Sequence, residues 1–319
     1  MGSTRATPEL SVVVPLYNEE ESVREPYGRT SAVCSGLGVT YELVLVDDGS
    51  GDGTWAAIRR LSEADAHVRG FRLSRNYGHQ HALLAGLHMA RGRAIISMDG
   101  DLQHPPEVIP ALFEKWKEGS RVVLTKRLDR NLGSPLKRGS SKLFYRLFSY
   151  VAETSIQPGT SDFRLLDSAV LQQLLSFNFS RPFLRGAVET LGFERATVPF
   201  QVEPRFAGRS KYTLRRMIAF ARQGFIAHST VPLRLGIWLG LVTGVMALAE
   251  LGYVVVQFFR GQTVPGWASV LGMTALLFAV LFFIVGILGM YLEDIHELLK
   301  KRPRFIIAET CGDASKTRE

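Results

Sequence analysis

The chain has 319 residues, a formal net charge of +8 and 46% apolar residues, which is enough for one large domain or two. Its two cysteines, Cys34 and Cys311, are too few and too far apart for a disulfide framework or a zinc site, as expected in a reducing compartment. A basic excess favours nucleic acid, anionic lipid or phosphorylated substrates. Because the basic residues gather beside a long apolar stretch, we expect lipid headgroups and phosphorylated substrates as partners, and no nucleic acid.

Short apolar β-rich runs alternate with helical patterns along the first part of the chain. The predicted strands read LSVVVPL, YELVLVDD, RGFRLS, RAIISMD and RVVLTK. The predicted helices span residues 19–36, 54–64, 79–91 and 105–119. Strands that are apolar on both faces and joined by helices indicate an α/β fold with a Rossmann-like, mostly parallel, doubly wound sheet and flanking helices.

Polar and acidic residues follow these strands, at the edge where such sheets bind ligands. After the second strand, Asp47 and Asp48 begin the sequence DDGSGDGT, whose glycines allow the close approach of a ligand. An acid here can bind a nucleotide base or a ribose hydroxyl, and the same residues also suit an ordinary turn. The segment is not a P-loop, since no Gly-Lys-Ser/Thr follows it.

The sequence SMDGDLQHPPE places Asp99 and Asp101 directly after the predicted fourth strand. Two carboxylates at this spacing can hold Mg²⁺ or Mn²⁺, and Gln103 can add a neutral oxygen. Alternatively, the two acids stabilise the N-terminus of the helix that begins near Pro105. The nearby histidines do not form a convincing ligand set, and we expect a packing or helix-start role for His104.

Two later motifs offer groups for transfer chemistry. In GTSDFRLLD, Asp162 can orient or deprotonate an acceptor, or it can simply form a turn. In RFAGRSKYT, Arg209, Ser210 and Lys211 can clamp phosphate oxygens, or they belong to a solvated basic loop. Neither motif decides between its two interpretations by itself.

Two basic segments, residues 133–152 and 212–228, carry Leu, Phe and Tyr at helical spacing. They predict amphipathic helices at a membrane face, with ordinary surface helices as the alternative. Residues 232–292 are almost purely apolar and contain two stretches, about 235–259 and 267–291, each longer than the ~20 residues needed to cross a bilayer. We therefore predict a transmembrane hairpin.

Basic residues flank the hairpin at its outer ends, whereas the connecting turn holds only Arg260. By the positive-inside rule, the α/β part (residues 1–231), the tail (293–319) and both termini lie in the cytoplasm. The first residues contain no apolar signal region, which argues against export. Glu250 within the first span is expected to pack against the partner helix or a neighbouring subunit of a homo-oligomer. In the tail, RPRFIIAE predicts a short strand.

Six motifs occur in an order that resembles a known enzyme family: VVVPLYNEEESV, ELVLVDDGSGDGT, LSRNYGHQHAL, MDGDLQHPPE, GTSDFRLLD and RFAGRSKY. Together they cover the region before the hairpin and resemble the inverting glycosyltransferases of family 2, which have a GT-A fold. The closer likeness is to the polyisoprenyl-phosphate branch, which includes dolichol-phosphate mannose synthases and bacterial undecaprenyl-phosphate glucosyltransferases. The C-terminal hairpin resembles that of the two-span bacterial members.

The resemblance implies roles for individual residues. The nucleotide-sugar donor would be bound by residues at three strand ends: Pro15, Tyr17, Glu19, Asp47, Asp48, Asp99 and Gly100. The cofactor, Mg²⁺ or Mn²⁺, would be held with the donor diphosphate by Asp99, Asp101 and Gln103. Phosphate and acceptor contacts would come from these side chains: Arg127, Lys137, Arg138, Arg209, Ser210 and Lys211. Asp101 and Asp162 would be the catalytic residues, with Asp162 as a base or as a group that positions the acceptor.

The implied reaction moves a hexose, with inversion, from UDP-glucose or a similar donor to a polyisoprenyl phosphate such as undecaprenyl phosphate, at the inner membrane of the cell. A GDP-mannose-dependent synthase of the dolichol-phosphate-mannose type is the alternative. A processive polysaccharide synthase would carry Gln-x-x-Arg-Trp and further spans, which this sequence does not show. The last alternative is a non-catalytic membrane scaffold in which the acids form turns and caps.

Overall fold

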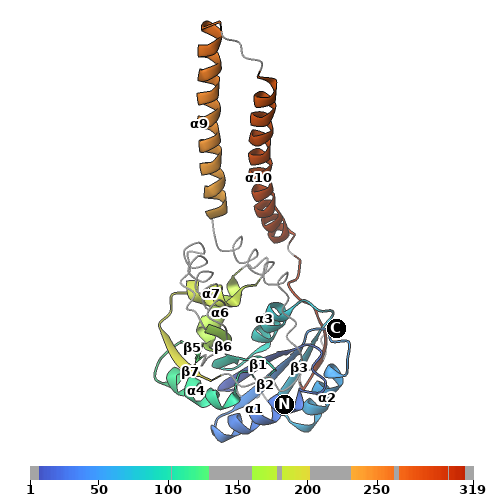
Figure 1. Ribbon diagram of the computed structural model, residues 1–319. Coiled ribbons are helices and arrows are strands. Elements are labelled where there is room, and N and C mark those ends of the chain that lie inside the picture. Colours follow the sequence, from blue (N-terminus) through green and yellow to red (C-terminus); the bar gives the residue numbers. More distant parts are fainter. Residues whose placement is uncertain are drawn as a thin grey trace. The chain divides into compact units, whose positions relative to one another are not determined.

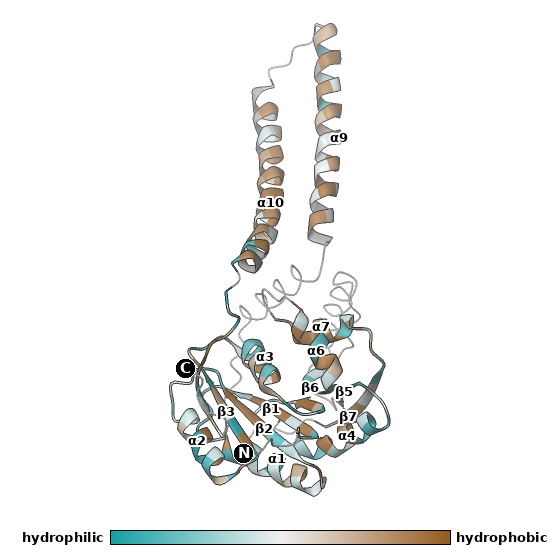
Figure 2. Cartoon of the chain, turned by 180° about the vertical axis from the view of Figure 1, so that it is seen from behind, coloured by the Kyte–Doolittle hydropathy of each residue, from teal (hydrophilic) through white to brown (hydrophobic). Residues whose placement is uncertain are grey.

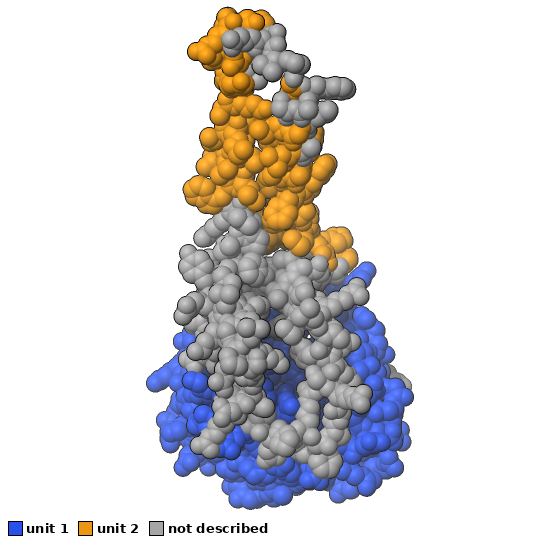
Figure 3. All heavy atoms as spheres, viewed as in Figure 1, with its two compact units in different colours: residues 1–145, 154–212, 302–319 blue, residues 146–153, 213–301 orange. Residues whose placement is uncertain are grey.

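The computed structural model of the chain describes residues 7–101, 103–128, 160–177, 182–201, 231–261, 266–300 and 302–312. The chain forms two compact units, which Figure 3 shows in different colours. Unit 1 comprises residues 1–145, 154–212 and 302–319, and unit 2 comprises residues 146–153 and 213–301. The C-terminal residues therefore belong with the N-terminal α/β unit, although they follow unit 2 in the chain.

Unit 1 is built on an eight-stranded sheet with the strand order β7-β5-β6-β4-β1-β2-β3-β8 (Figure 1). The strands are β1 (Leu10–Leu16), β2 (Tyr41–Asp47), β3 (Val68–Leu73), β4 (Ala94–Ser97), β5 (Val122–Arg127), β6 (Thr160–Asp167), β7 (Arg195–Phe200) and β8 (Ile307–Cys311). Only β6 and β8 run against the others: β6 is antiparallel to β4 and β5, and β8 is antiparallel to β3. The predicted mostly parallel sheet is thus confirmed, and β6 and β8 add antiparallel pairs.

Helices cover both faces of this sheet (Figure 1). One face carries α1 (Arg24–Gly36), α2 (Thr54–Ala64) and α4 (Ile109–Lys117), which follows the short 3₁₀ helix η1 (Pro106–Val108). The other face carries α3 (His79–Met89), α6 (Ser168–Ser176) and α7 (Leu184–Thr190). Each layer has its own apolar core against the sheet. Every residue of β1 and β2 is buried as a result, the pattern of a parallel sheet that is covered on both faces.

The first helix begins later than the sequence pattern predicts. That pattern starts the helix at residue 19, whereas α1 begins at Arg24. Asn18 has a left-handed φ of 53°, and both its backbone N–H and its side chain bond to the loop after β2. These contacts hold residues 17–20 as a loop at the sheet edge, which delays the helix.

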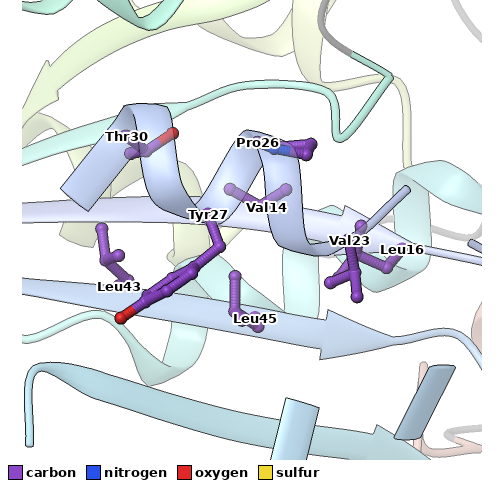
Figure 4. A pocket seen from close by; sticks show the side chains of 8 residues that line it. All are labelled: Val14, Leu16, Val23, Pro26, Tyr27, Thr30, Leu43 and Leu45. Atoms are coloured by element: carbon purple, nitrogen blue, oxygen red, sulfur yellow. The ribbon is translucent and has the colours of Figure 1, made fainter. Parts of the chain in front are cut away.

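A small apolar pocket lies between α1 and strands β1 and β2 (Figure 4). Its lining residues are Val14, Leu16, Val23, Pro26, Tyr27, Thr30, Leu43 and Leu45. The two hydroxyl groups in this set are already bonded within the protein, Tyr27 to Asp65 Oδ2 at 2.9 Å and Thr30 to the Met98 sulfur. The pocket is therefore a packing space of the core, and the polar functional groups lie elsewhere.

Unit 2 contains two long helices, α9 (Val231–Phe259) and α10 (Trp267–Leu299). Within them, Gly236–Phe259 and Gly272–Glu293 are long and apolar enough to cross a membrane, by length and composition. The two helices contact each other, and Figure 2 shows apolar residues along both of them. They confirm the predicted hairpin of apolar helices.

The surface of this helix pair is apolar. Exposed side chains include Ile237 at 72%, Phe258 at 69% and Phe259 at 82% of their maximum. Soluble monomers rarely expose so many large apolar side chains in one place, so the pair requires an apolar environment or a partner. The predicted amphipathic helices at 133–152 and 212–228 lie outside the described residues.

Candidate active site

Several strand ends of unit 1 meet at one edge of the sheet. The chain places β2 and β3 on one side of β1 and then β4 on the other side, so the direction of strand addition reverses between β1 and β4. Doubly wound sheets bind their ligands at such a reversal. Because β6 is antiparallel to β4, with Ser97 opposite Arg164, Asp162 at the start of β6 lies at the same edge as Asp99. Arg127 ends β5 at this edge too.

Two loops at this edge, residues 17–20 after β1 and 48–53 after β2, are tied together by hydrogen bonds. The Asn18 N–H donates to Ser50 Oγ at 2.9 Å, and Asn18 Oδ1 accepts from the Gly51 N–H at 3.0 Å. Further bonds join Glu20 to Asp52 and Gly53. The two loops therefore form one connected platform.

Three predicted donor-binding residues belong to the first loop or to the end of β1. Pro15 is buried in β1 opposite Val46, whereas Tyr17 is 40% exposed. The Glu19 carboxylate accepts a hydrogen bond from the Ser22 hydroxyl. Tyr17 is thus the member of this group that presents a large side chain to solvent.

Asp47, at the end of β2, has one carboxylate oxygen that its neighbours do not satisfy. Asp47 Oδ1 accepts a hydrogen bond from the Ser50 N–H at 2.9 Å. Asp47 Oδ2 is buried, lies 3.4 Å from Arg72 Nε, and accepts no hydrogen bond from the described part of the chain. Because a buried oxygen without a hydrogen bond is costly, Asp47 Oδ2 is a candidate acceptor for a ligand N–H or O–H.

Asp48 uses both of its oxygens inside the protein. They accept hydrogen bonds from the backbone N–H groups of Tyr77 at 2.8 Å and Gly78 at 2.9 Å, in the loop before α3. Burial raises the pKa of Asp48, and these two hydrogen bonds lower it in part. Gly49 has φ +64°, and a Cβ there would lie 2.3 Å from the Arg75 carbonyl carbon, so the turn needs glycine. Asp48 therefore shapes the loop that leads to α3, and its contact with a donor stays a prediction.

The acid pair Asp99 and Asp101 directly follows β4, at the reversal in the sheet. The side chain of Asp99 is 33% exposed, and Asp101 Oδ1 accepts a hydrogen bond from the Gln103 N–H at 3.1 Å. Gly100 between them is buried, and a Cβ there would lie 2.5 Å from Leu16 Cδ2. The turn therefore packs closely against the end of β1.

The helix that follows the acid pair begins without a side-chain cap from its own N-cap residue. Neither η1 nor α4 receives a side-chain hydrogen bond at its N-cap, and the acid in the first turn of η1 is Glu107. The Glu107 carboxylate in turn pairs with Arg29 at 2.7 Å. The alternative role of Asp99 and Asp101, stabilisation of the helix N-terminus, therefore stays a prediction.

The residues around the acid pair fit a hard divalent cation. Two carboxylates and the Gln103 amide oxygen are the oxygen ligands that Mg²⁺ and Mn²⁺ prefer. The described residues contain no group of three or more His, Cys, Asp and Glu side chains that could hold a metal, so water and a ligand diphosphate would complete the shell. Arg127 Nε is buried and donates no hydrogen bond to the described residues, which suits an anion beside it.

Two histidines lie against Asp99. His79, the first residue of α3, places Nε2 3.3 Å from Asp99 Oδ1, a proximity that the sequence does not indicate. His104 is buried and stacks on Phe163 with ring centroids 5.2 Å apart, in agreement with the expected packing role. Burial lowers the pKa of His104, and its Nδ1 accepts the Asp99 backbone N–H at 3.1 Å. His104 is therefore neutral, and the 3.5 Å approach of its Nδ1 to Asp99 Oδ2 is no ion pair.

The buried carboxylate of Asp162 is held by cationic and polar groups, of which Arg164 is buried too. It accepts hydrogen bonds from Arg164 Nη2 at 2.5 Å, Arg185 Nη2 at 2.8 Å and Gln80 Nε2 at 3.0 Å. Burial favours the protonated acid, but the charges of Arg185 and Arg164 outweigh it and hold the pKa of Asp162 far below its usual range. Asp162 is thus an ionised carboxylate, which makes it a weak base.

Sequence reasoning missed the partners of Asp162. Arg164 follows Asp162 by two residues on β6, so strand alternation places both side chains on one face of the sheet. That spacing was visible in the motif GTSDFRLLD. Arg185 on α7 and Gln80 on α3 come from distant parts of the chain, and no local pattern points to them.

Five predicted phosphate and acceptor residues lie outside the described part of the chain: Lys137, Arg138, Arg209, Ser210 and Lys211. Among the described residues, the sheet edge brings together seven of the predicted side chains: Tyr17, Asp47, Asp99, Asp101, Gln103, Arg127 and Asp162. Gln103 and Arg127 come within 3.5 Å of each other, between Oε1 and Nη2. The edge therefore combines two acids suited to a cation with basic groups suited to phosphate.

A comparison with solved structures defines the fold. The chain is similar to glucosyl-3-phosphoglycerate synthase from Mycobacterium tuberculosis, crystallised with Mn²⁺, uridine diphosphate and phosphoglyceric acid. The TM-score is 0.50 with 22% identity, and the match covers 70% of this chain and 78% of that chain. This likeness shows a GT-A fold.

The family follows from sequence comparison. The family model described as Glycosyl transferase family 2 matches residues 11–175. The uncharacterised glycosyltransferase YkcC of Bacillus subtilis is 36% identical over 309 residues, covering 97% of this chain and 96% of that protein. A prophage bactoprenol glucosyl transferase homolog of Escherichia coli is 33% identical over 300 residues, covering 94% and 98%. The chain belongs to glycosyltransferase family 2.

Proposed function

We propose that the protein is a membrane-bound, inverting glycosyltransferase that moves a hexose from a nucleotide sugar to a polyisoprenyl phosphate. UDP-glucose and undecaprenyl phosphate are the favoured substrates. The observation that carries this proposal is the acid pair Asp99 and Asp101 at the reversal in the sheet, beside the unsatisfied oxygen of Asp47. The proposal is supported by the E. coli relative, whose name states glucosyl transfer and bactoprenol and which aligns with 94% of the chain.

We assign the donor to the platform of the two joined loops. Asp47 Oδ2 would accept a hydrogen bond from the nucleoside, while Tyr17 would cover the base or ribose. The diphosphate would lie toward the end of β4, where Arg127 Nε is available to it. Pro15, Glu19 and Gly100 would contribute by shaping these loops.

We assign Asp99, Asp101 and Gln103 as the residues that hold Mg²⁺ or Mn²⁺. When bound, the cation would offset the charge that develops on the departing nucleoside diphosphate. The related synthase from M. tuberculosis, crystallised with Mn²⁺ and uridine diphosphate, supports this assignment. Arg127 would stabilise the same leaving group from the β5 side.

The transfer step needs little acid–base machinery from the protein. A phosphate oxygen of the acceptor would attack the anomeric carbon, forming a new C–O bond while the bond from that carbon to the nucleoside diphosphate breaks. A phosphate monoester has a second pKa of ~6, so the acceptor is largely a dianion at neutral pH and requires no strong base. The low pKa of Asp162 favours its positioning role over proton abstraction. We therefore infer that ionised Asp162 holds Arg185 toward the substrates.

We assign the remaining predicted elements to the lipid acceptor and the membrane. Residues Gly236–Phe259 and Gly272–Glu293 would span the inner membrane, with the catalytic unit and both termini in the cytoplasm. The acceptor phosphate would be bound by basic and polar side chains near the membrane: Lys137, Arg138, Arg209, Ser210 and Lys211. A homo-oligomer could form along the helix that carries Glu250.

Calorimetric titration of the detergent-purified protein tests the donor half of the proposal. We expect UDP-glucose to bind in the presence of Mn²⁺ and to lose affinity when EDTA is added. GDP-mannose provides the comparison, and tighter binding of GDP-mannose would favour the dolichol-phosphate-mannose alternative. Absence of binding by every nucleotide sugar would favour the non-catalytic scaffold.

A further inference from the structure

The C-terminal strand β8 forms the edge of the sheet beside β3, although residues 213–301 of unit 2 separate it in the chain from the other strands of unit 1. β8 is antiparallel to β3, with Glu309 opposite Arg72 and Cys311 opposite Gly70. The fit is close, because a Cβ on Gly70 would lie 2.5 Å from Cys311 Sγ. β8 is therefore packed into the sheet rather than loosely attached to its edge.

Glu309 on β8 fixes the position of Arg72. Glu309 Oε1 accepts a hydrogen bond from Arg72 Nη1 at 2.8 Å, and Glu309 Oε2 accepts one from Trp55 Nε1 at 2.9 Å. The hydrogen bonds from Trp55 and Arg72 hold the pKa of Glu309 below its usual range, so its carboxylate is ionised at neutral pH. Both oxygens of Glu309 are thus occupied, and Trp55 orients the carboxylate toward Arg72.

The other nitrogens of Arg72 reach the donor platform. Arg72 Nε lies 3.4 Å from Asp47 Oδ2, and Arg72 Nη2 lies 3.4 Å from the Ser50 carbonyl oxygen. Each of the three guanidinium nitrogens therefore faces a different group. Asp47 is fully buried, and the Arg72 guanidinium lies against its Oδ2, the oxygen that accepts no hydrogen bond from the described residues.

We propose that β8 contributes to the donor site: Glu309 and Trp55 hold Arg72 against Asp47, and Arg72 in turn fixes the orientation of the Asp47 carboxylate for the nucleoside. Glu309 and Trp55 are positioning residues that act through Arg72. The inference rests on the proposed function, because it requires that Asp47 binds a nucleotide. It implies that the donor site is completed only when the chain after the two long apolar helices has paired with β3.

The test is UDP binding to the full-length, detergent-purified protein in the presence of Mn²⁺, measured by calorimetry for the parent and six variants. Glu309→Gln keeps the size of the side chain and removes its charge, and we expect UDP to bind about three- to tenfold more weakly, the scale of one charge-assisted contact. Trp55→Phe should weaken binding in the same direction. Glu118→Gln is the matched control, because it breaks the similarly exposed Lys115–Glu118 pair at 2.7 Å at the C-terminal end of α4 and should leave the Kd unchanged.

A double-substitution series separates a relay from a general structural effect. If Glu309 acts through Arg72, Glu309→Gln should weaken UDP binding no further in a protein that already carries Arg72→Ala. Additive losses, or a parental Kd in Glu309→Gln, would overturn the inference. If Asp47→Asn weakens UDP binding, the proposed donor site is supported whether or not Glu309 acts through Arg72. A parent protein that binds no UDP with Mn²⁺ would contradict the proposed function and this inference together.

Discussion

Replacing Asp162 by Asn removes the negative charge that Arg164 and Arg185 share, while the size of the side chain stays nearly the same. The Arg164 side chain is 4% exposed, so the substitution leaves a buried guanidinium without its counter-ion. Breaking a buried ion pair in this way costs about 3–5 kcal/mol. The Arg185 side chain is 39% exposed, and solvent screens most of what its pair with Asp162 contributes.

This loss of stability is large enough to measure by thermal unfolding. With about 2–4 °C per kcal/mol for a domain of 150–250 residues, we expect the apparent Tm of Asp162→Asn to fall by ~6–20 °C. Transfer should also be lost, since Arg185 is no longer held, whereas UDP binding with Mn²⁺ at low temperature should persist. The double variant Asp162→Asn/Arg164→Leu removes the uncompensated charge and should recover part of the lost Tm.

The pH dependence of this difference follows from the lowered pKa of Asp162. A carboxyl whose pKa is lower in the folded than in the unfolded protein stabilises the fold above its unfolded pKa of about 3.9, and loses that effect as the pH falls toward its folded pKa. We therefore expect the Tm difference between the parent and Asp162→Asn to be constant from about pH 8 to pH 5 and to shrink below about pH 4. A Tm equal to that of the parent at pH 7 would refute the ion-pair account of Asp162.

Three further predictions follow from the same sheet edge. Replacing Asp99 or Asp101 by Ala should abolish the Mn²⁺-dependent part of UDP binding in calorimetry. A variant that binds UDP as tightly as the parent, both with EDTA and with Mn²⁺, would contradict the metal assignment. Asp48→Ala leaves two half-buried backbone N–H groups without their acceptor and should lower the unfolding free energy by about 1–3 kcal/mol, measured by denaturant unfolding. Gly100→Ala places a Cβ 2.5 Å from Leu16 Cδ2, so it should lower the unfolding free energy by about 1–3 kcal/mol and reduce the rate of glycosyl transfer. A transfer rate equal to that of the parent would argue against close packing at Gly100.

The central strands could be predicted because strands buried on both faces appear in the sequence as continuous apolar runs. Runs such as LSVVVPL are apolar throughout, since helices cover both faces of the sheet. Their polar ends gather at one edge of the sheet, and Asp99 and Asp101 follow β4 as predicted from the apolar run that precedes them. The start of α1 was placed too early, because the bonds between Asn18 and the second loop are not encoded in helical periodicity.

Adjacent acids show where sequence reasoning stops. Asp47 and Asp48 are both aspartates and are adjacent in the chain. Both oxygens of Asp48 accept hydrogen bonds from the loop before α3, whereas Asp47 Oδ2 accepts no hydrogen bond from the described residues. The roles of Arg185 and of Glu309 depend on contacts with Asp162 and Arg72 across 23 and 237 residues of sequence. Such contacts are set by tertiary packing, so no local pattern predicts them.

The most direct test of the proposed function measures the transfer itself. The detergent-purified protein is incubated with undecaprenyl phosphate, Mn²⁺ and radiolabelled UDP-glucose, and the lipid is then extracted and counted beside a reaction with Asp99→Ala. The proposal predicts radiolabel in the lipid fraction of the parent reaction, and its loss in EDTA and in the variant. A lipid fraction without label, for UDP-glucose and for a panel of other labelled nucleotide sugars, would contradict the assignment of this chain as a polyisoprenyl-phosphate glycosyltransferase.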